Sequence, residues 1–118
     1  MDEFPIFDPQ AIRRLEEWGG KDLPRKMVDI FLRDTPSRMT RIEKGFEDED
    51  PDSVEAGAHS LKSSAGNLGA HKLQALLQEV ETAAADGDLK RVAQHLPELR
   101  EIFHQTLDAL EGFKKGIS

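Results

Sequence analysis

Apolar residues recur at intervals of three and four along most of the chain, which is the spacing of one face of an α-helix. No stretch alternates apolar with polar residues for long, so strands are not expected. Asp8, Asp22 and Asp50 are predicted to cap helix N-termini, and Gly87 is predicted to follow a helix end. The predicted helices cover about residues 9–18, 22–46, 51–67, 70–85 and 88–113.

Four of these segments are long, amphipathic and joined by short loops. They predict an all-α fold, an antiparallel up-down-up-down four-helix bundle with an additional short N-terminal helix at one end or side. Trp18 is expected to anchor that short helix by packing beside Gly19 and Gly20. Pro36 and Pro97 fall inside two long helices, and we expect kinks there because the apolar stripe continues through each proline.

Composition narrows the classes of function. The 118 residues predict a single domain covering residues 1–118. With 16 basic and 23 acidic residues the net charge is −7, which has the wrong sign for binding nucleic acid or an anionic membrane. There is no cysteine, no signal-peptide pattern and no apolar run of membrane-spanning length, so a cytoplasmic protein is expected.

A metal site is not expected either. Cysteine ligands are missing, and the histidines never lie three or four positions apart, as a pair of ligands on one helix requires. The four histidines are His59, His71, His95 and His104. For the last three we expect ordinary surface or packing positions.

The third predicted helix carries the candidate chemistry. Its apolar stripe has alternating spacings of four and three, which fixes the side that faces the core; the stripe consists of Val54, Ala58, Leu61, Ala65 and Leu68. At about 100° per residue, His59 points roughly 140° away from the centre of that stripe and should be exposed. Glu55, Ala56, Lys62, Ser63 and Gly66 surround it on the same outer face.

Two glycines in this helix need an explanation, because each costs up to about 1 kcal/mol relative to alanine in a helix interior. One hypothesis is that Gly57 and Gly66 clear space for an approaching partner surface. The alternative is that Gly57 and Ala58 allow tight packing between helices, while Gly66 anticipates the helix end near Gly69.

The run Ala58–Ala70, with the sequence AHSLKSSAGNLGA, resembles the signature of histidine-containing phosphotransfer (HPt) domains of multistep two-component phosphorelays. The resemblance covers nearly the whole chain. Further matching segments are Phe7-Asp8-Pro9, Gly19-Gly20, residues 31–36 and residues 96–99. One position departs from the family pattern, because Ser63 stands where the family most often has glycine. Its hydroxyl would either hinder a partner slightly or donate a hydrogen bond to a phosphoryl oxygen.

The resemblance implies that His59 accepts a phosphoryl group on Nε2 from an aspartyl phosphate and passes it to a second receiver domain. Lys62 would offset phosphoryl charge. The implied partners are response-regulator receiver domains and a hybrid sensor kinase, which bind around Glu55, Ala56, Ser63 and Gly66. The chain itself needs no cofactor, since Mg²⁺ would belong to the receiver, and we expect a monomer without turnover of its own.

A side chain should hold the imidazole so that Nε2 presents its lone pair. Folding the fourth helix back on the third brings Gln78 to Glu81 level with His59. Glu81 matches the family position that often carries a polar partner for the histidine. Gln78 is the alternative, and both residues would be solvated surface if neither touches the ring.

Two other classes of function remain to be distinguished from phosphotransfer. A helical protein-interaction bundle would keep the shape without the relay, and the presence of both His59 and Lys62 argues against it. A bundle enzyme or metalloprotein is disfavoured by the missing ligand pairs.

Overall fold

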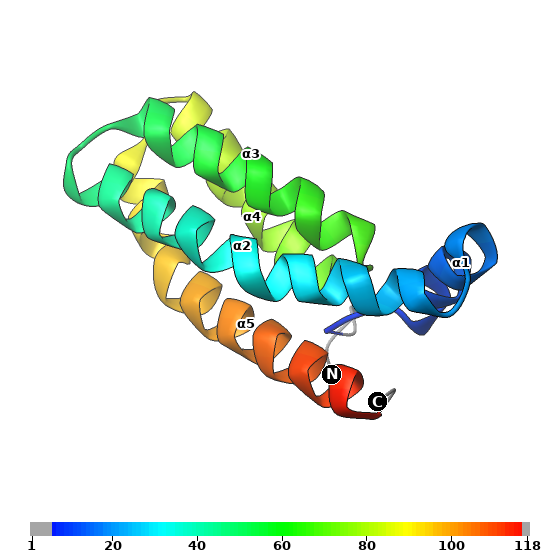
Figure 1. Cartoon of the computed structure of the whole chain (residues 1–118). Helices are drawn as coiled ribbons and strands as arrows, with labels where there is room; N and C mark the ends of the chain where they lie inside the picture. Colours follow the sequence, from blue (N-terminus) through cyan, green and yellow to red (C-terminus); the bar gives the residue numbers. More distant parts are fainter. Residues whose placement is uncertain (1–5, 117–118) are drawn as a thin grey trace.

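The computed structural model describes residues 6–116, within which every regular element is an α-helix. The five helices are α1 (Pro9–Gly19), α2 (Asp22–Glu47), α3 (Pro51–Asn67), α4 (His71–Ala85) and α5 (Leu89–Gly116). Figure 1 shows α2 to α5 side by side and antiparallel in succession, with α1 at one end of the molecule. The predicted fold class is confirmed, and the predicted boundaries agree with the helices to within about three residues.

Local sequence explains where most helices begin and end. The side chain of Asp8 accepts a hydrogen bond from the Gln10 backbone N–H, and that of Asp50 accepts one from the Ser53 backbone N–H. Each is followed by proline at the first helical position, where no N–H is needed. Gly87 follows α4 with a φ of 69°, the left-handed conformation that glycine adopts most easily.

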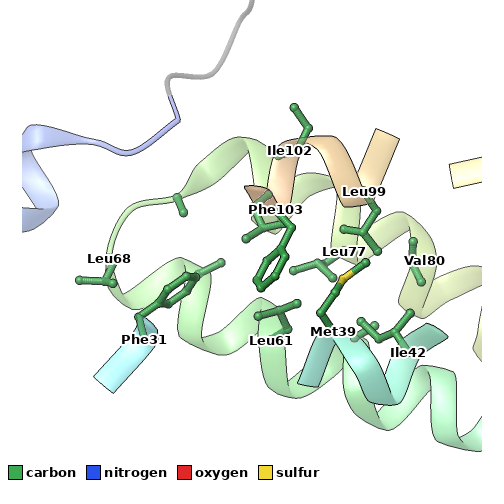
Figure 2. Close-up of a cluster of buried hydrophobic side chains, with 14 of the residues drawn as sticks. Phe31, Met39, Ile42, Leu61, Leu68, Leu77, Val80, Leu99, Ile102 and Phe103 are labelled. Carbon is green, nitrogen blue, oxygen red and sulfur yellow. The ribbon is translucent and has the colours of Figure 1, made fainter. Parts of the chain in front are cut away.

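The bundle closes around one apolar core. Helix α2 packs on α3, α3 on α4, α4 on α5, and α5 returns to α2. Every residue of the stripe predicted on the third helix is at most 1% exposed. Figure 2 shows core side chains of the other helices around those of α3. The labelled side chains are Phe31, Met39, Ile42, Leu61, Leu68, Leu77, Val80, Leu99, Ile102 and Phe103.

Two predictions about the N-terminal half are wrong. Trp18 is 76% exposed and anchors nothing, because α1 buries only its first two turns, through Ala11, Ile12 and Leu15. Asp22 is not a cap: it is the first residue of α2, and the residue before it, Lys21, is helical and makes no side-chain cap. The Asp22 carboxylate therefore acts only as a negative charge in the first turn.

The two internal prolines do not divide their helices. Pro36 lies inside α2 and Pro97 inside α5, and each helix continues on both sides of its proline. Both prolines are exposed, on the side of the helix turned away from the core. None of the helices between residues 6 and 116 is long and apolar enough to cross a bilayer.

Candidate functional site

Helix α3 presents His59 to solvent. Because Ala58 and Leu61 are fully buried on either side of it in the sequence, the intervening position turns outward. The imidazole side chain is 66% exposed. The predicted orientation of this residue is therefore observed.

The antiparallel pairing of α3 with α4 decides what faces His59. A turn at Leu68–Ala70 joins the two helices, and Gly69 adopts a φ of 71° there. Three pairs of residues then face each other at successive turns, and the residue numbers in each pair add up to the same value: His59 with Glu81, Lys62 with Gln78, and Gly66 with Gln74. This constant register places one polar residue of α4 opposite each turn of the outer face of α3.

Glu81 binds the imidazole directly. Its Oε2 lies 2.7 Å from His59 Nδ1. Burial acts to raise the pKa of Glu81, but hydrogen bonds from Lys62 and His59 outweigh it and hold the pKa below its ordinary value. An ionised carboxylate can only accept hydrogen bonds, so Nδ1 carries the hydrogen and the neutral ring keeps its lone pair on Nε2.

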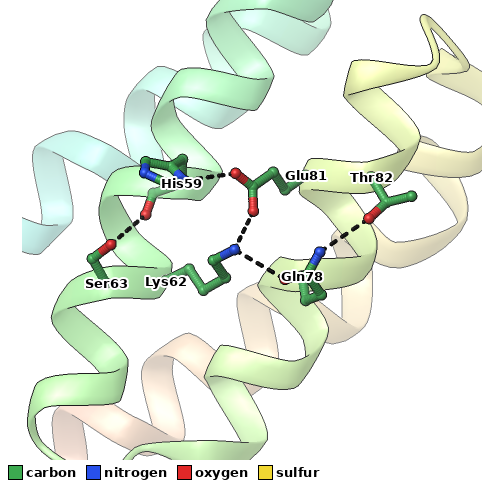
Figure 3. A network of polar contacts seen from close by, with 6 residues as sticks. All are labelled: His59, Lys62, Ser63, Gln78, Glu81 and Thr82. Carbon is green, nitrogen blue, oxygen red and sulfur yellow. Dashed lines mark hydrogen bonds and ion pairs between the residues drawn. The ribbon is translucent and has the colours of Figure 1, made fainter.

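The same carboxylate also binds Lys62. Glu81 Oε1 accepts from Lys62 Nζ, which in addition donates to Gln78 Oε1 at 2.9 Å. Gln78 Nε2 donates to Thr82 Oγ1 at 3.1 Å, and this bond orients the amide so that its oxygen faces the lysine. Figure 3 shows the resulting network between α3 and α4, with Glu81 shared by His59 and Lys62.

The two candidates on α4 both bind Lys62, and they differ in their relation to His59. Glu81 contacts the imidazole, whereas Gln78 contacts Lys62. The bond between Lys62 and Glu81 and the bond between Gln78 and Thr82 were missed in the sequence analysis. The antiparallel register and the four-residue spacing of Gln78 and Thr82 are the signals that would have revealed them.

The residues expected to bind a partner lie around this network. Ser63 is exposed, while Glu55, Ala56 and Gly66 are half-buried. The Ser63 hydroxyl donates to the His59 carbonyl oxygen at 3.2 Å, a bond within its own helix. An open hollow lies beside this face, lined by Lys62, His71, Gln74, Ala75 and Gln78.

The two glycines of α3 have different surroundings. A Cβ atom on Gly57 would lie 2.9 Å from Ile42 Cγ1 and 3.3 Å from the Arg38 carbonyl oxygen, so this glycine allows α2 to pack closely. The docking hypothesis is wrong for Gly57. The three atoms nearest to a Cβ atom on Gly66 would all belong to the side chain of Gln74, with its amide nitrogen at 2.8 Å.

His71 and His104 have other contacts. His71 Nε2 is 3.4 Å from Asp8 Oδ2, and its Nδ1 is 3.3 Å from Gln74 Oε1, which joins the start of α4 to the cap of α1. The ring of His104 lies against that of Phe103. In the part of the chain that the structure describes, no three His, Asp or Glu residues gather in an arrangement able to hold a metal ion.

Solved structures share this fold over nearly the whole chain. The histidine-containing phosphotransfer protein B of Pseudomonas aeruginosa superposes with a TM-score of 0.87 at 22% identity, covering 94% of this chain and 96% of that one. A putative histidine-containing phosphotransfer protein from rice gives 0.76 at 19% identity, covering 95% and 84% of the two chains. The maize protein ZmHP2 gives 0.73 at 24% identity, covering 91% and 86%.

Sequence comparison agrees. The chain is 20% identical over 98 residues to the phosphorelay intermediate protein rdeA of Dictyostelium discoideum, which aligns with 83% of this chain. The chain spans 39% of the length of that relative. Residues 26–112 match the Hpt domain family, and this segment includes α3, α4 and all of the polar network. The chain belongs to the Hpt domain family.

Proposed function

We propose that this chain relays a phosphoryl group between aspartates of receiver domains, with His59 as the residue that carries it. The observation that supports this most strongly is an exposed imidazole whose Nδ1 is bound by an ionised carboxylate, at 2.7 Å from Glu81. That contact leaves the Nε2 lone pair directed to solvent, where an aspartyl phosphate would approach. In this role Glu81 is a positioning residue.

Lys62 would assist from the neighbouring turn of α3. Its ammonium group is bound by Gln78 and by Glu81, the residue that also binds His59, and its side chain is 21% exposed. A cation there offsets the charge of an incoming phosphoryl group. Because positioning and charge dominate phosphoryl transfer, the remaining machinery, including Mg²⁺ and the second aspartate, would belong to the receiver.

The partners that fit this role are receiver domains, of a hybrid sensor kinase on one side and of a response regulator on the other. They would dock over Glu55, Ala56, Ser63 and Gly66, which border His59. A monomeric cytoplasmic carrier of this kind binds no cofactor of its own and completes no catalytic cycle alone. The relative named as a phosphorelay intermediate supports this assignment.

Incubation with phosphorylated receiver domains tests the proposal. We expect the chain to acquire acid-labile, base-stable phosphate, and the His59→Gln variant to acquire none while keeping its helical content. His59 contributes little to the core, so the variant should melt at nearly the same temperature. Uptake on another histidine would contradict the site, and the absence of uptake from every receiver would instead favour a protein-interaction bundle.

A further inference from the structure

We propose that His59 keeps its Nδ1 proton after phosphorylation, so that the carrier stores its phosphoryl group on an imidazolium ring paired with the Glu81 carboxylate. This inference rests on the proposed function and specifies the protonation state in which the site works. Its consequence is that the phosphoryl group enters and leaves without any proton transfer.

The geometry places the carboxylate where it would act. Glu81 Oε2 lies 2.7 Å from Nδ1, and the Glu81 side chain is only 16% exposed, so water competes poorly for this position. If the phosphorylated ring lost its Nδ1 proton, two lone pairs would face each other across this contact. Retaining the proton replaces that repulsion with a charge-assisted hydrogen bond.

The bond changes balance without a base. The Nε2 lone pair forms a bond to the phosphorus of the aspartyl phosphate, and the phosphorus–oxygen bond breaks with its electron pair moving to the aspartate. The ring gains one positive charge, which the adjacent Glu81 carboxylate offsets, and the hydrogen stays on Nδ1. The reverse sequence delivers the phosphoryl group to the next aspartate. The protonated ring leaves phosphorus as neutral imidazole, whereas a ring without the Nδ1 proton would have to leave as an imidazolate anion, which is a poorer leaving group.

Lys62 prevents the carboxylate from taking that proton. A carboxylate bound only to an imidazolium could accept its hydrogen, but Glu81 is also bound through its other oxygen to Lys62 Nζ. The lysine stabilises the ionised form of Glu81 and so lowers its basicity. The shared carboxylate is therefore an acceptor that holds the proton on the ring and does not remove it.

Three other charged residues lie near His59 along α3 itself. Glu55 and Asp52 lie one and two turns before His59 on the same outer face, and Lys62 lies one turn after it. From α4 the group that faces the ring is Glu81. Glu55 and Asp52 have the same sign as Glu81, so a test must separate a direct pair from the general field of these carboxylates.

The test measures the ring directly in the phosphorylated chain. Potassium phosphoramidate, a small chemical phosphoryl donor, loads His59 without any receiver, and nitrogen-15 spectra of labelled histidine report whether Nδ1 is protonated at each pH. Because Glu81 accepts the Nδ1 hydrogen, we expect Nδ1 to stay protonated to a higher pH in the folded chain than in the same phosphorylated chain unfolded in urea. The unfolded reference makes the test independent of any variant.

Two variants distinguish the direct contact between Glu81 and His59 from the general electrostatic effect of the nearby carboxylates. Glu81→Gln keeps the shape of the side chain and should lower the midpoint of Nδ1 protonation toward that of the unfolded chain. Glu79→Gln removes the same charge from an exposed position on the same helix and should leave the midpoint unchanged. The pH profile of spontaneous dephosphorylation should move with the midpoint, because the imidazolium form is the one that loses its phosphoryl group.

Equal midpoints in the folded and unfolded chains would overturn the inference, as would equal shifts in the two variants. Failure of phosphoramidate to load His59 would also overturn it, since the Nε2 lone pair must be open. Failure of every receiver to transfer phosphate, with the midpoint shifted as expected, would instead reject the proposed function and leave the protonation state established.

Discussion

At the scale of single residues, the site depends on one carboxylate with two partners. Glu81 orients the imidazole through one oxygen and holds the ammonium group of Lys62 through the other. Neither oxygen is free to turn toward the Nε2 side of the ring. The Glu81 charge is therefore paired with Nδ1 and the lysine, and the lysine stays within one helical turn of His59.

Replacing Lys62 with methionine should slow phosphotransfer in both directions without unfolding the bundle. The variant keeps the buried aliphatic stem and removes the charge, and a partly exposed ion pair contributes only about 0.2–1 kcal/mol to stability. Rapid-quench transfer assays with a phosphorylated receiver, together with thermal melting, check both expectations. Lys90→Met, at an exposed position on α5, is the matched control. Unchanged rates in the Lys62 variant would show that the lysine only neighbours the site.

At the scale of elements, the two glycines of α3 have different roles: one allows a neighbouring helix to pack closely, and the other leaves the outer face of α3 open. Gly57 lies against α2, where an added methyl group would approach Ile42 and a backbone carbonyl of Arg38. Gly66 lies against the flexible end of Gln74, which can move aside. The same residue type thus supports the contact of α3 with α2 at one position and the open outer face at another.

This difference predicts opposite effects of the same substitution. Gly57→Ala should destabilise the fold by about 1–3 kcal/mol, because the strain of overpacking exceeds the gain of about 1 kcal/mol in helix propensity. Gly66→Ala should leave the stability level or raise it by up to about 1 kcal/mol. Urea unfolding of both variants measures the difference. Equal destabilisation at the two positions would refute the assignment.

The attachment of α1 should depend on pH. The backbone hydrogen bond from Gln10 is the main cause that lowers the pKa of Asp8, and His71 adds to it. A carboxyl group whose pKa is lower in the folded state stabilises that state above its ordinary pKa, and the contribution is lost as the pH falls through the lowered value. Helix α1 should therefore loosen in acid before the rest of the bundle.

Amide hydrogen exchange at Ala11 and Ile12 between about pH 5 and pH 2 measures this loosening. Asp8→Asn can still accept the capping hydrogen bond but carries no titrating charge, so the protection of α1 in this variant should not change over that range. Loss of protection over the same pH range in both chains would contradict the role given to Asp8.

At the scale of the whole molecule, four helices share one core and the outer face of α3 carries the proposed site. The core is continuous across α2 to α5, and ion pairs also tie α5 to α2, between Arg100 and Glu43 and between Lys114 and Asp29. The outer face of α3 lies away from this core. Substitutions on that face should therefore change partner binding and leave the fold intact.

Gly66→Arg tests this separation. A bulky side chain within an interface can cost several kcal/mol of binding energy, whereas removal of a helical glycine changes stability by at most about 1 kcal/mol. We expect weaker receiver binding and slower transfer with level or increased stability. Gly112→Arg on α5 is the control, because nothing lies within 4 Å of the added Cβ position there. Loss of folding, with unchanged affinity in the folded fraction, would make Gly66 a structural glycine.

Local patterns in the chain were enough to predict the helices, the buried stripe of α3 and the exposure of His59. Helix periodicity and caps depend on residues within about four positions of one another, and those are visible in the order of the chain. The helix rise and the short turn also predict that Gln78 and Glu81 lie level with His59, because they limit which residues of two antiparallel helices can face each other.

Which of these residues contact one another depends on how the helices pack. The packing assigned Glu81 to the ring and Gln78 to Lys62, placed Gly57 against α2, and left Trp18 in solvent. Each outcome depends on how two helices pack against each other. That packing depends in turn on the whole core, in which side chains distant in sequence are closely packed. Periodicity shows which face of a helix is buried, but the element that covers it is selected only when all the helices pack together.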